Sequence, residues 1–535
     1  MNRNFFKIIF ILLIIILGGI AIYTNFYNKG EILQAEEFKP VSTEKIVKSN
    51  NIRIGIIEFD NLNPILSNNK NVQDISRLIF DPLFILTQDY KLEGSLATEC
   101  SKLDDFTYII KLREDVKWHD GNEFNVWDVI FTIDMLKNEE NNSIYRYNVS
   151  NIAGLEEIDE YTLKIILNEK VEYFEYNLIF PIVSSKYFNE ENFKYESKNL
   201  KPPGTGMFYV SDITNNNILL KRNIDGWKKE NLKLDSINLN LYNSLSSTIN
   251  GFKNQEIDIF TTSNKNIEEY LKNTDYIKQE YINRNYSYIV LNCNNKVLNN
   301  IEVRQAINSA INKEEIIKDI YGKRYRQSNF PLDFGSYAYD TNNIVIVPDK
   351  NVSKALLVDN GWKYSSKKWR KTVNYRYLSI ELNLLVNKDV SNMVKVAKKI
   401  KEQLESVGIA VKIIEAKNNQ YNRYLNNKQY DLALVNSNYG YSPSLDKYFG
   451  ENNLANYSNE EIINILNGIE NITDENELNK QYSRIAEIYN DEVPYISLYY
   501  NTNNFIYSSS LKGSIMPNSY NLFCGIQNWY REYKK

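Results

Sequence analysis

Residues Ser379–Val386, SIELNLLV, begin an alternation of strands and helices within this 535-residue chain. After this first strand, apolar side chains recur at helical spacing over residues 393–407, and Gly408 follows them as a stop signal. A strand at 409–414 and a short helix at 421–427 continue the alternation. The order predicts an α/β fold with parallel strands and helices on the faces of the sheet.

The apolar run Tyr430–Val435, YDLALV, closes this unit as a buried strand. In parallel sheets, ligands collect at the carboxyl ends of the strands. The loop that follows Val435 is Asn436–Pro443, NSNYGYSP. We therefore expect a ligand site at this loop.

The first half of the chain carries separate α/β signals. Apolar and polar residues alternate over 106–113 and over 161–167, which predicts two half-buried strands. Between them Asn125 can cap a helix that has Asp128 at its third position. The segment Pro202–Gly206, PPGTG, predicts a rigid turn before another strand.

Composition excludes several classes of function. The chain has 63 Lys and Arg against 67 Asp and Glu, so its formal charge of −4 argues against nucleic acid as a partner. The single histidine, His119, makes a His-based zinc site or a Ser-His triad improbable, and we interpret it as a structural turn residue rather than a general base. No CxxC pair exists, and the pairing of Cys100, Cys293 and Cys524 stays open.

The N-terminal sequence is typical of a segment that targets a protein to the membrane. Arg3 and Lys7 precede an apolar run of 16 residues, Ile8–Tyr23, which lies between the length of a signal-peptide core and that of a spanning helix. We expect residues 1–23 to be an uncleaved signal anchor, with a cleaved signal peptide as the alternative. Both place the body outside the membrane. Residues 24–49 are polar and predict a tether.

Several motifs, in order along residues 50–535, resemble the extracellular solute-binding proteins of peptide and nickel ABC importers, family 5. The motifs are Asn61–Pro64 with Leu78–Phe84, Tyr108–Gly121 with Phe124 and Trp127–Thr132, Gly204–Gly206, Val303–Asn308 with Ile311–Lys313, Asn360–Trp362, and Leu404–Val435. Each motif alone is weak, but their common order is specific. The chain is therefore identified as a member of this family.

The resemblance implies a two-lobed, hinged, type II periplasmic-binding fold. Lobe 1 would comprise residues 50–289 and 499–535, with an extra subdomain at about 89–200, and lobe 2 would comprise 290–498. It implies no catalysis and no cofactor: a monomer would hold a peptide or other small solute between closing lobes and dock on a membrane ABC permease. Gram-positive members usually carry a lipidated Cys, and here a helix anchor would take its place.

One departure from the family concerns the expected ligand loop. Peptide-binding members place an Asp four residues before the Pro of this loop, where it takes the ligand's α-ammonium, and the matching residue here is Tyr439. A buried ammonium needs a counter-charge that a phenol does not supply. The nearest alternatives are Asp446, Glu58 and Asp60. Nickel held by imidazoles is not expected, because the only histidine lies outside the loop.

Nine residues are the candidate ligand contacts. Four come from the strand-end loop, two from the first crossover between lobes, two from the end of the first strand and one from the return crossover. They are Asn436, Asn438, Tyr439 and Tyr441; Tyr288 and Asn292; Phe59 and Leu62; and Tyr499.

Two functions stay open on these residues. The first is a membrane-anchored receptor that captures peptides or peptide-like solutes for an ABC importer. The second, suggested by Tyr439 and by the anchor without lipid, is a solute-sensing or interaction protein that kept the binding fold but serves no uptake. An enzyme is not expected, because the patterns of nucleophiles and metal ligands are missing.

Overall fold

The computed structural model describes residues 46–228, 232–322, 325–340 and 346–534. Their contacts divide the chain into one large unit, residues 48–532, and a small one that includes the described residues 46–47 and 533–534. Apart from the ends of β1 and β23, the features below belong to the large unit.

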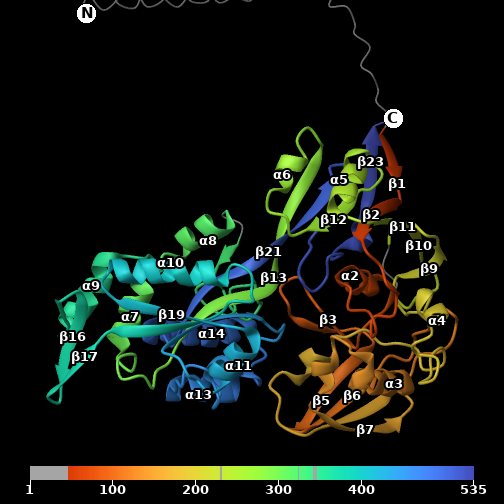
Figure 1. The fold of residues 1–535 in the computed structure, drawn as a ribbon. Helices are drawn as coiled ribbons and strands as arrows, with labels where there is room; N and C mark the ends of the chain where they lie inside the picture. The colour runs from red at the N-terminus through yellow and green to blue at the C-terminus, as the bar shows by residue number, and fades with distance from the viewer. Residues whose placement is uncertain (1–45, 229–231, 323–324, 341–345, 535) are drawn as a thin grey trace, which may run out of the picture. The chain divides into compact units, whose positions relative to one another are not determined.

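Eleven of the described strands form one mixed sheet, in which the two longest, β13 (Tyr276–Leu291) and β21 (Tyr495–Ser508), are neighbours (Figure 1). A short strand, β14 (Arg326–Gln327), pairs with β21 outside the main order. That order is β19 (Ala410–Ala416), β18 (Glu381–Asn387), β20 (Leu432–Asn438), β13, β21, β12 (Ile259–Thr262), β2 (Asn51–Ile57), β11 (Ser236–Tyr242), β10 (Asn217–Arg222) and β9 (Phe208–Ile213).

The pairing of β13 with β21 is interrupted at Arg284. Antiparallel pairing runs as far as Ile282 opposite Thr502 and resumes at Tyr286 opposite Tyr500. Arg284 lies in the gap with a φ of 71°, a conformation that residues other than glycine adopt rarely. Beyond the gap, β13 also pairs with β20 on its other edge. Arg284 therefore marks the point at which β13 gains a second partner strand.

The alternating pattern in the second half is confirmed. Strand β18 pairs in parallel with β19 on one side and with β20 on the other. The helices between them are α10 (Met393–Ser406) and α11 (Asn418–Asn426). The apolar face of α10 packs into a core that also contains Leu384 and Leu434, and Gly408 ends the turn after this helix with a φ of 90°.

The element boundaries in this unit differ from the predicted ones by one to three residues, and one of these differences changes the site. Strand β20 does not end at Val435 but continues to Asn438, because Asn436 and Asn438 pair with Ser287 and Asn285 of β13. The loop therefore begins at Tyr439, and Asn436 belongs to the sheet.

The two strands predicted in the first half are confirmed as β6 (Thr107–Leu112) and β8 (Thr162–Leu167). They form an antiparallel sheet with β5 (Ala97–Asp104) and β7 (Ile152–Asp159), in the order β5-β6-β8-β7. Helix α3 (Val126–Lys137) begins with the predicted cap, in which the Asn125 side chain accepts from the Trp127 backbone N–H and the Asp128 carboxylate accepts from the Asn125 N–H.

The Pro202–Gly206 turn packs against the end of helix α2 (Lys70–Ile79). The backbone N–H of Gly206 donates to the carbonyl of Ile79 at 2.8 Å. A Cβ on Gly204 would lie 1.8 Å from that same carbonyl oxygen, so only glycine fits there. Thr205 then reaches the carboxylate of Asp81 at 3.1 Å. The turn thus fixes the position of α2.

His119 is part of this same junction. Its Nδ1 accepts from the Gly204 N–H at 3.1 Å, and its Nε2 lies 3.0 Å from the Gly206 carbonyl. These contacts require a neutral ring with its proton on Nε2. Burial holds the pKa of His119 below its ordinary value, although the Gly206 carbonyl opposes the shift. The contacts agree with the expected structural role.

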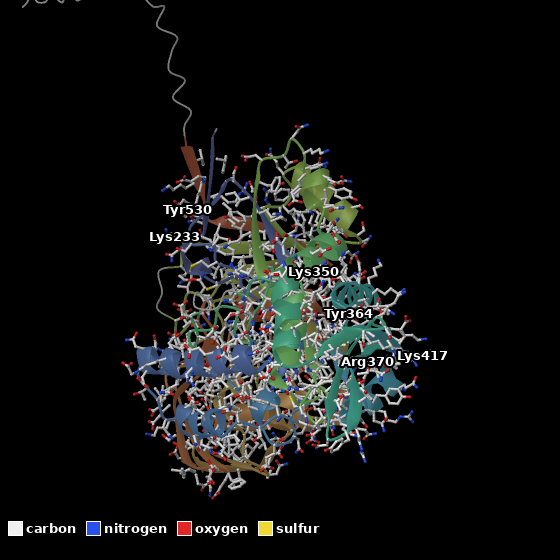
Figure 2. The ribbon with its side chains drawn as sticks, turned by 90° about the vertical axis from the view of Figure 1, so that its left-hand side faces the viewer. Lys233, Lys350, Tyr364, Arg370, Lys417 and Tyr530 are labelled. Atoms are coloured by element: carbon white, nitrogen blue, oxygen red, sulfur yellow. The ribbon has the colours of Figure 1, made fainter. Side chains whose placement is uncertain are left out.

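A small three-stranded sheet packs against the core that contains Leu384 and Leu434. It consists of β15 (Lys363–Ser365), β16 (Lys368–Val373) and β17 (Arg376–Ser379). Tyr364 and Arg370 of this sheet are visible in Figure 2. The indole of Trp369 is buried beneath Tyr364 and donates to the carbonyl of Val407 at 2.8 Å.

The remaining helices and strands are shorter or flank the sheets. The helices are α4 (Glu196–Leu200), α5 (Leu245–Lys253), α6 (Ile267–Tyr270), α7 (Ile301–Ala310), α8 (Lys313–Tyr321), α9 (Lys350–Asp359), α12 (Asp446–Phe449), α13 (Glu460–Ile469) and α14 (Glu475–Glu492). The strands are β1 (Ile46–Ser49), β3 (Phe84–Leu86), β4 (Leu92–Gly94), β22 (Leu511–Lys512) and β23 (Tyr530–Lys534).

Some predictions concern residues or properties beyond this description. The expected signal anchor, residues 1–23, and most of the tether lie outside the described residues. Within the described ranges no helix has the length and apolar character needed to cross a membrane. The three cysteines are free thiols. The lobe boundaries near 290 and 498 stay a prediction.

Candidate ligand-binding site

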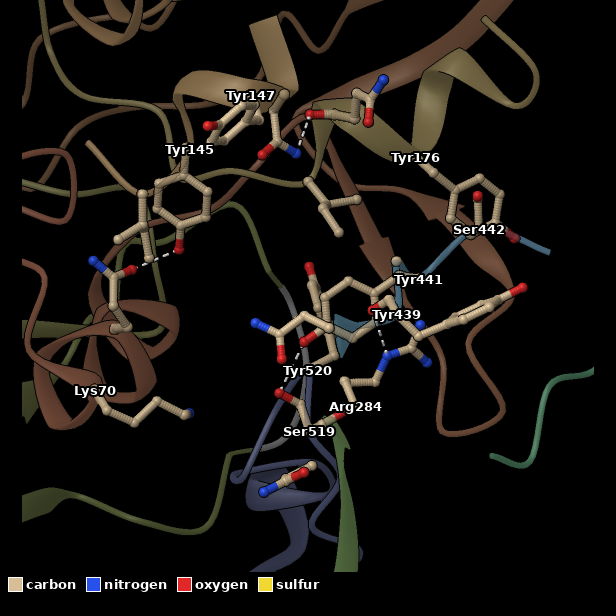
Figure 3. A pocket seen from close by; sticks show the side chains of 18 of the residues that line it. Lys70, Tyr145, Tyr147, Tyr176, Arg284, Tyr439, Tyr441, Ser442, Ser519 and Tyr520 are labelled. Atoms are coloured by element: carbon tan, nitrogen blue, oxygen red, sulfur yellow. Dashed lines mark hydrogen bonds between the residues drawn. The ribbon is translucent and has the colours of Figure 1, made fainter. Parts of the chain in front are cut away.

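A cavity of about 740 Å³ is the candidate site (Figure 3). Its walls come from α2, from the segments 144–148 and 176–179, from β13 at its interruption, from the loop after β20 and from a segment near the C-terminus. The lining residues are Asn68, Lys70, Gln73, Asp74, Arg77, Ile144, Tyr145, Tyr147, Asn148, Tyr176, Asn177, Ile179, Asn283, Arg284, Asn438, Tyr439, Gly440, Tyr441, Ser442, Ser519 and Tyr520.

Helix α2 presents one polar stripe to the cavity. Lys70, Gln73, Asp74 and Arg77 follow helical spacing, so they share a face, and the Asn69 side chain caps the helix by accepting from the Asn71 N–H. Lys70 forms an ion pair with Asp74. The Gln73 carbonyl oxygen accepts from the Tyr145 hydroxyl at 2.6 Å. Asp74 is the only carboxylate of this stripe, and Lys70 already pairs with it.

Arg284 and Tyr439 join β13 to the strand-end loop. The Tyr439 N–H donates to the Arg284 carbonyl at 2.9 Å, and Arg284 Nε donates to the Tyr439 carbonyl at 3.3 Å. Figure 3 shows the second of these bonds between the two labelled residues. The interruption of β13 therefore shapes the site, because it places the Arg284 guanidinium at the end of β20.

Aromatic rings surround the Arg284 guanidinium. Its central carbon lies 4.0 Å from the ring centroid of Phe334, 4.5 Å from that of Tyr441, 5.1 Å from that of Tyr90 and 5.4 Å from that of Tyr439. Cation–π contacts of this kind are attractive, but they supply no hydrogen-bond acceptor. Arg284 is 4% exposed, and its two terminal nitrogens have no hydrogen-bond partner among the described residues.

Tyr439 supplies no charge to the site. Its ring is buried and stacks over that of Tyr448, with 6.2 Å between the centroids. Its hydroxyl donates to the Ser444 carbonyl at 3.0 Å. Burial raises the pKa of Tyr439, while the Arg284 charge opposes this and Glu172 adds to it. The Tyr439 side chain is therefore neutral at physiological pH, and it offers no counter-charge to an ammonium group.

The wall formed by α2 and residues 519–520 contributes a second cation and Tyr520. The Arg77 guanidinium lies 3.6 Å from the ring centroid of Tyr520, and the Tyr441 hydroxyl donates to the Ser519 carbonyl at 3.0 Å. Burial raises the pKa of Tyr520, and the Arg77 charge opposes the shift. Arg77 and Tyr520 also line a neighbouring cavity of about 270 Å³.

Three of the nine predicted contacts line the main cavity: Asn438, Tyr439 and Tyr441. The other six do not, and each has another role in the structure. Asn436 donates to Asn285 and Ser287 within the sheet, and Asn292 donates to the Tyr430 carbonyl at 3.0 Å. Leu62, Tyr288 and Tyr499 are buried in the hydrophobic interior. Phe59 is partly buried and packs against the core that contains Leu62 and Tyr288. Their contact with a ligand stays a prediction.

Sequence reasoning missed Arg284 and the stripe on α2. A charged residue within the strand pattern of 276–291 is a weak signal for Arg284. The stripe had a stronger signal, because Lys70, Asp74 and Arg77 recur at helical spacing opposite Val72, Ile75 and Ile79. In residues 46–228, 232–322, 325–340 and 346–534, no cluster of three His, Cys, Asp or Glu could hold a metal ion.

Comparison with known proteins places the chain among solute-binding proteins. A family model described as bacterial extracellular solute-binding proteins, family 5 middle, matches residues 91–458. Di/tripeptide-binding protein 1 of Pseudomonas aeruginosa is 24% identical over 434 residues, 75% of this chain and 78% of that protein. Glutathione-binding protein GsiB of Shigella flexneri is 27% identical over 500 residues, 86% of this chain and 91% of that protein.

Solved structures share the fold. The structure of HbpA2 from Haemophilus parasuis matches with a TM-score of 0.74 at 21% identity, over 91% of this chain and 100% of that one. The mixed α/β architecture described above is therefore shared with HbpA2.

Proposed function

Because the chain belongs to the family 5 bacterial extracellular solute-binding proteins, we propose that it captures a peptide or peptide-like solute in the 740 Å³ cavity. We propose further that it delivers this solute to an ABC permease. The observation that carries the proposal is the cavity itself, which combines aromatic walls with a few placed polar groups, as ligand sites do.

The relatives support a peptide-like ligand. One is named as a di/tripeptide-binding protein and another as a glutathione-binding protein, and both align over most of their length. Their ligands share amide groups and a small size. The cavity volume lies within the range of about 300–1,000 Å³ that is usual for small-molecule sites.

The walls of the cavity fit the proposed two-lobe mechanism. In the proposed division, α2, the segments 144–148 and 176–179, and residues 519–520 belong to lobe 1, whereas residues 438–442 belong to lobe 2. A ligand that contacts both sets favours the closed form, because some of its contacts exist only when the lobes meet. Residues 1–23 would anchor the body outside the membrane and keep it close to its permease.

No catalytic step is part of the proposal. The only histidine is used in the junction between α2 and the 202–206 turn. The family consists of solute-binding proteins, and the loop after β20 brings Tyr439, Gly440, Tyr441 and Ser442 to the cavity.

Gly440 allows a direct test of the cavity. A Cβ built on Gly440 meets no atom within 4 Å, so Gly440→Trp adds an indole at the wall of the cavity without a clash at the backbone. Gly468 in α13 has equally open space outside the cavity, so Gly468→Trp is a matched control. The probe is a pool of short peptides of random sequence, and the readout is the free energy of unfolding.

A peptide present at 100 times its Kd should add about 2.7 kcal/mol to the free energy of unfolding. We expect this gain in the wild type and in Gly468→Trp but not in Gly440→Trp. The proposal is refuted if the wild type gains nothing, or if Gly440→Trp gains as much as the wild type.

A further inference from the structure

Arg284 stands out among the buried charges of the described chain. Arg284 is only 4% exposed, yet its Nη1 and Nη2 have no hydrogen-bond partner among the described residues. The large majority of buried polar atoms in folded proteins are hydrogen-bonded. A guanidinium presents five donors, and here only Nε is engaged, by the Tyr439 carbonyl. Its unused donors call for an acceptor that comes from outside the chain.

The surroundings do not neutralise this charge. The charged residues that line the cavity are three cations, Lys70, Arg77 and Arg284, and one acid, Asp74. Asp74 is paired with Lys70 on α2. The acid that acts on the neighbouring Tyr439, Glu172, accepts from the Ser444 hydroxyl at 2.6 Å, and burial raises its pKa. The cavity therefore has a surplus of positive charge around Arg284.

We propose that Arg284 receives a carboxylate of the ligand, so that the anionic end of the solute lies beside the strand-end loop. This inference rests on the proposed function and names the chemical class of its ligand. A carboxylate offers two oxygens in one plane, which matches the fork of Nη1 and Nη2. One negative charge balances one guanidinium, and the neutral Tyr439 beside it supplies nothing that would repel an anion.

The carboxylate reaches the fork by displacing one ring. Phe334 and Tyr441 are the two closest rings to the guanidinium, and Phe334 is buried whereas Tyr441 is half-buried at the cavity wall. Tyr441 is therefore the ring that moves. The same side chain would then cover the bound ligand.

The test compares three versions of one peptide pool of three to five residues, built without Asp and Glu. The first version has free ends, the second is amidated at the C-terminus and the third is acetylated at the N-terminus. Breaking a buried charge pair should weaken binding by at least about 30-fold. We expect that weakening from amidation, and a change of less than about threefold from acetylation.

A carboxylate could also come from a side chain of the ligand. An amidated pool that contains Glu distinguishes the two sources, because it binds as tightly as the free-ended pool only if a side-chain carboxylate reaches Arg284. Either source supports the proposal. If all versions bind equally, or if acetylation weakens binding more than amidation does, the proposal is wrong and the peptide-binding function stands. If no pool binds, the proposed function itself fails.

Variants assign the effect to Arg284. Arg284→Met removes the charge and should abolish the preference for free-ended over amidated peptides, whereas Arg284→Lys should keep part of it. Arg423→Met is the matched control, because Arg423 also lies against a ring, that of Tyr424 at 5.5 Å, but on α11 outside the cavity. If Arg284→Met is unfolded, the comparison of the pools on the wild type decides the matter. A preference that survives in folded Arg284→Met overturns the assignment.

Discussion

Arg284 and Tyr439 hold each other through two hydrogen bonds, one from the Tyr439 N–H to the Arg284 carbonyl and one from Arg284 Nε to the Tyr439 carbonyl. The pair joins the interruption of β13 to the end of β20. It also leaves the outer nitrogens of the guanidinium without partners beside a 740 Å³ cavity. A shift in either residue should therefore change both the fold of the loop and the charge that a ligand meets.

Substitutions at Tyr439 separate these two effects. In Tyr439→Asp a carboxylate would stand beside Arg284 and occupy its fork, so we expect the preference for free-ended over amidated peptides to disappear. The lost ring should lower the free energy of unfolding by about 3 kcal/mol. Tyr439→Phe loses only the hydroxyl bond to Ser444, which should cost about 1 kcal/mol and leave the preference intact. Peptide titrations and urea unfolding measure both quantities, and an unchanged preference in Tyr439→Asp contradicts the prediction.

Gly204 should tolerate no side chain. A Cβ there would lie 1.8 Å from the Ile79 carbonyl oxygen, so Gly204→Ala must displace the end of α2 or the 202–206 turn. We expect a loss of at least about 2 kcal/mol in the free energy of unfolding. Gly468→Ala, in the open space on α13, should instead be neutral or slightly stabilising. Equal stability of the two variants would show that the turn does not fix α2 as described.

His119 should make the protein less stable in acid. Burial lowers its pKa in the folded state below the value of about 6.5 expected in the unfolded chain, so the unfolded state binds more protons below that pH. The free energy of unfolding should therefore fall as the pH drops from about 6.5 to 5. His119→Gln cannot take up this proton, and the difference in stability between wild type and variant should shrink over the same range. A pH-independent difference would contradict the prediction.

Lys313 should affect stability on the alkaline side. It is buried, its Nζ donates to the Ser328 carbonyl and to Asn329 Oδ1, and burial lowers its pKa to about 7, while Asp333 acts in the opposite direction. Between pH 7 and about 10 the unfolded state then holds a proton that the folded state has lost, so stability should rise with pH.

The rise from Lys313 is at most about 1.4 kcal/mol per pH unit. Urea unfolding at pH 7 and pH 9 measures it in the wild type, and Lys313→Met should remove it. Lys388→Met, which alters an exposed lysine, is the control. The same pH dependence in Lys313→Met and in the wild type would show that another group causes it.

Much of the fold could be predicted because local pattern and tertiary structure agree. Apolar alternation located β6 and β8, helical spacing located α10, and Asn125 with Asp128 located the start of α3. The end of β20 was missed because its last residues, Asn436 and Asn438, are poor strand formers in isolation. They are held in the sheet by backbone pairing with β13, which no local pattern reveals.

The candidate site was only partly predictable for a similar reason. The rule that ligands collect at strand ends led to Asn438, Tyr439 and Tyr441, which do line the cavity. Arg284 comes from another strand, β13. It lies at the cavity because the pairing of β13 with β21 is interrupted there and because Arg284 itself has a φ of 71°. Both features depend on contacts between strands more than 150 residues apart, as the Arg284–Tyr439 separation of 155 illustrates.

Native mass spectrometry of the protein, purified without denaturation, shows whether the cavity holds a ligand with a carboxylate. We predict that wild-type protein retains small peptides with a free carboxylate, that Gly440→Trp retains none, and that Arg284→Met loses them during purification. A retained ligand without any acidic group, or the same ligand at the same occupancy in Gly440→Trp, would contradict the account.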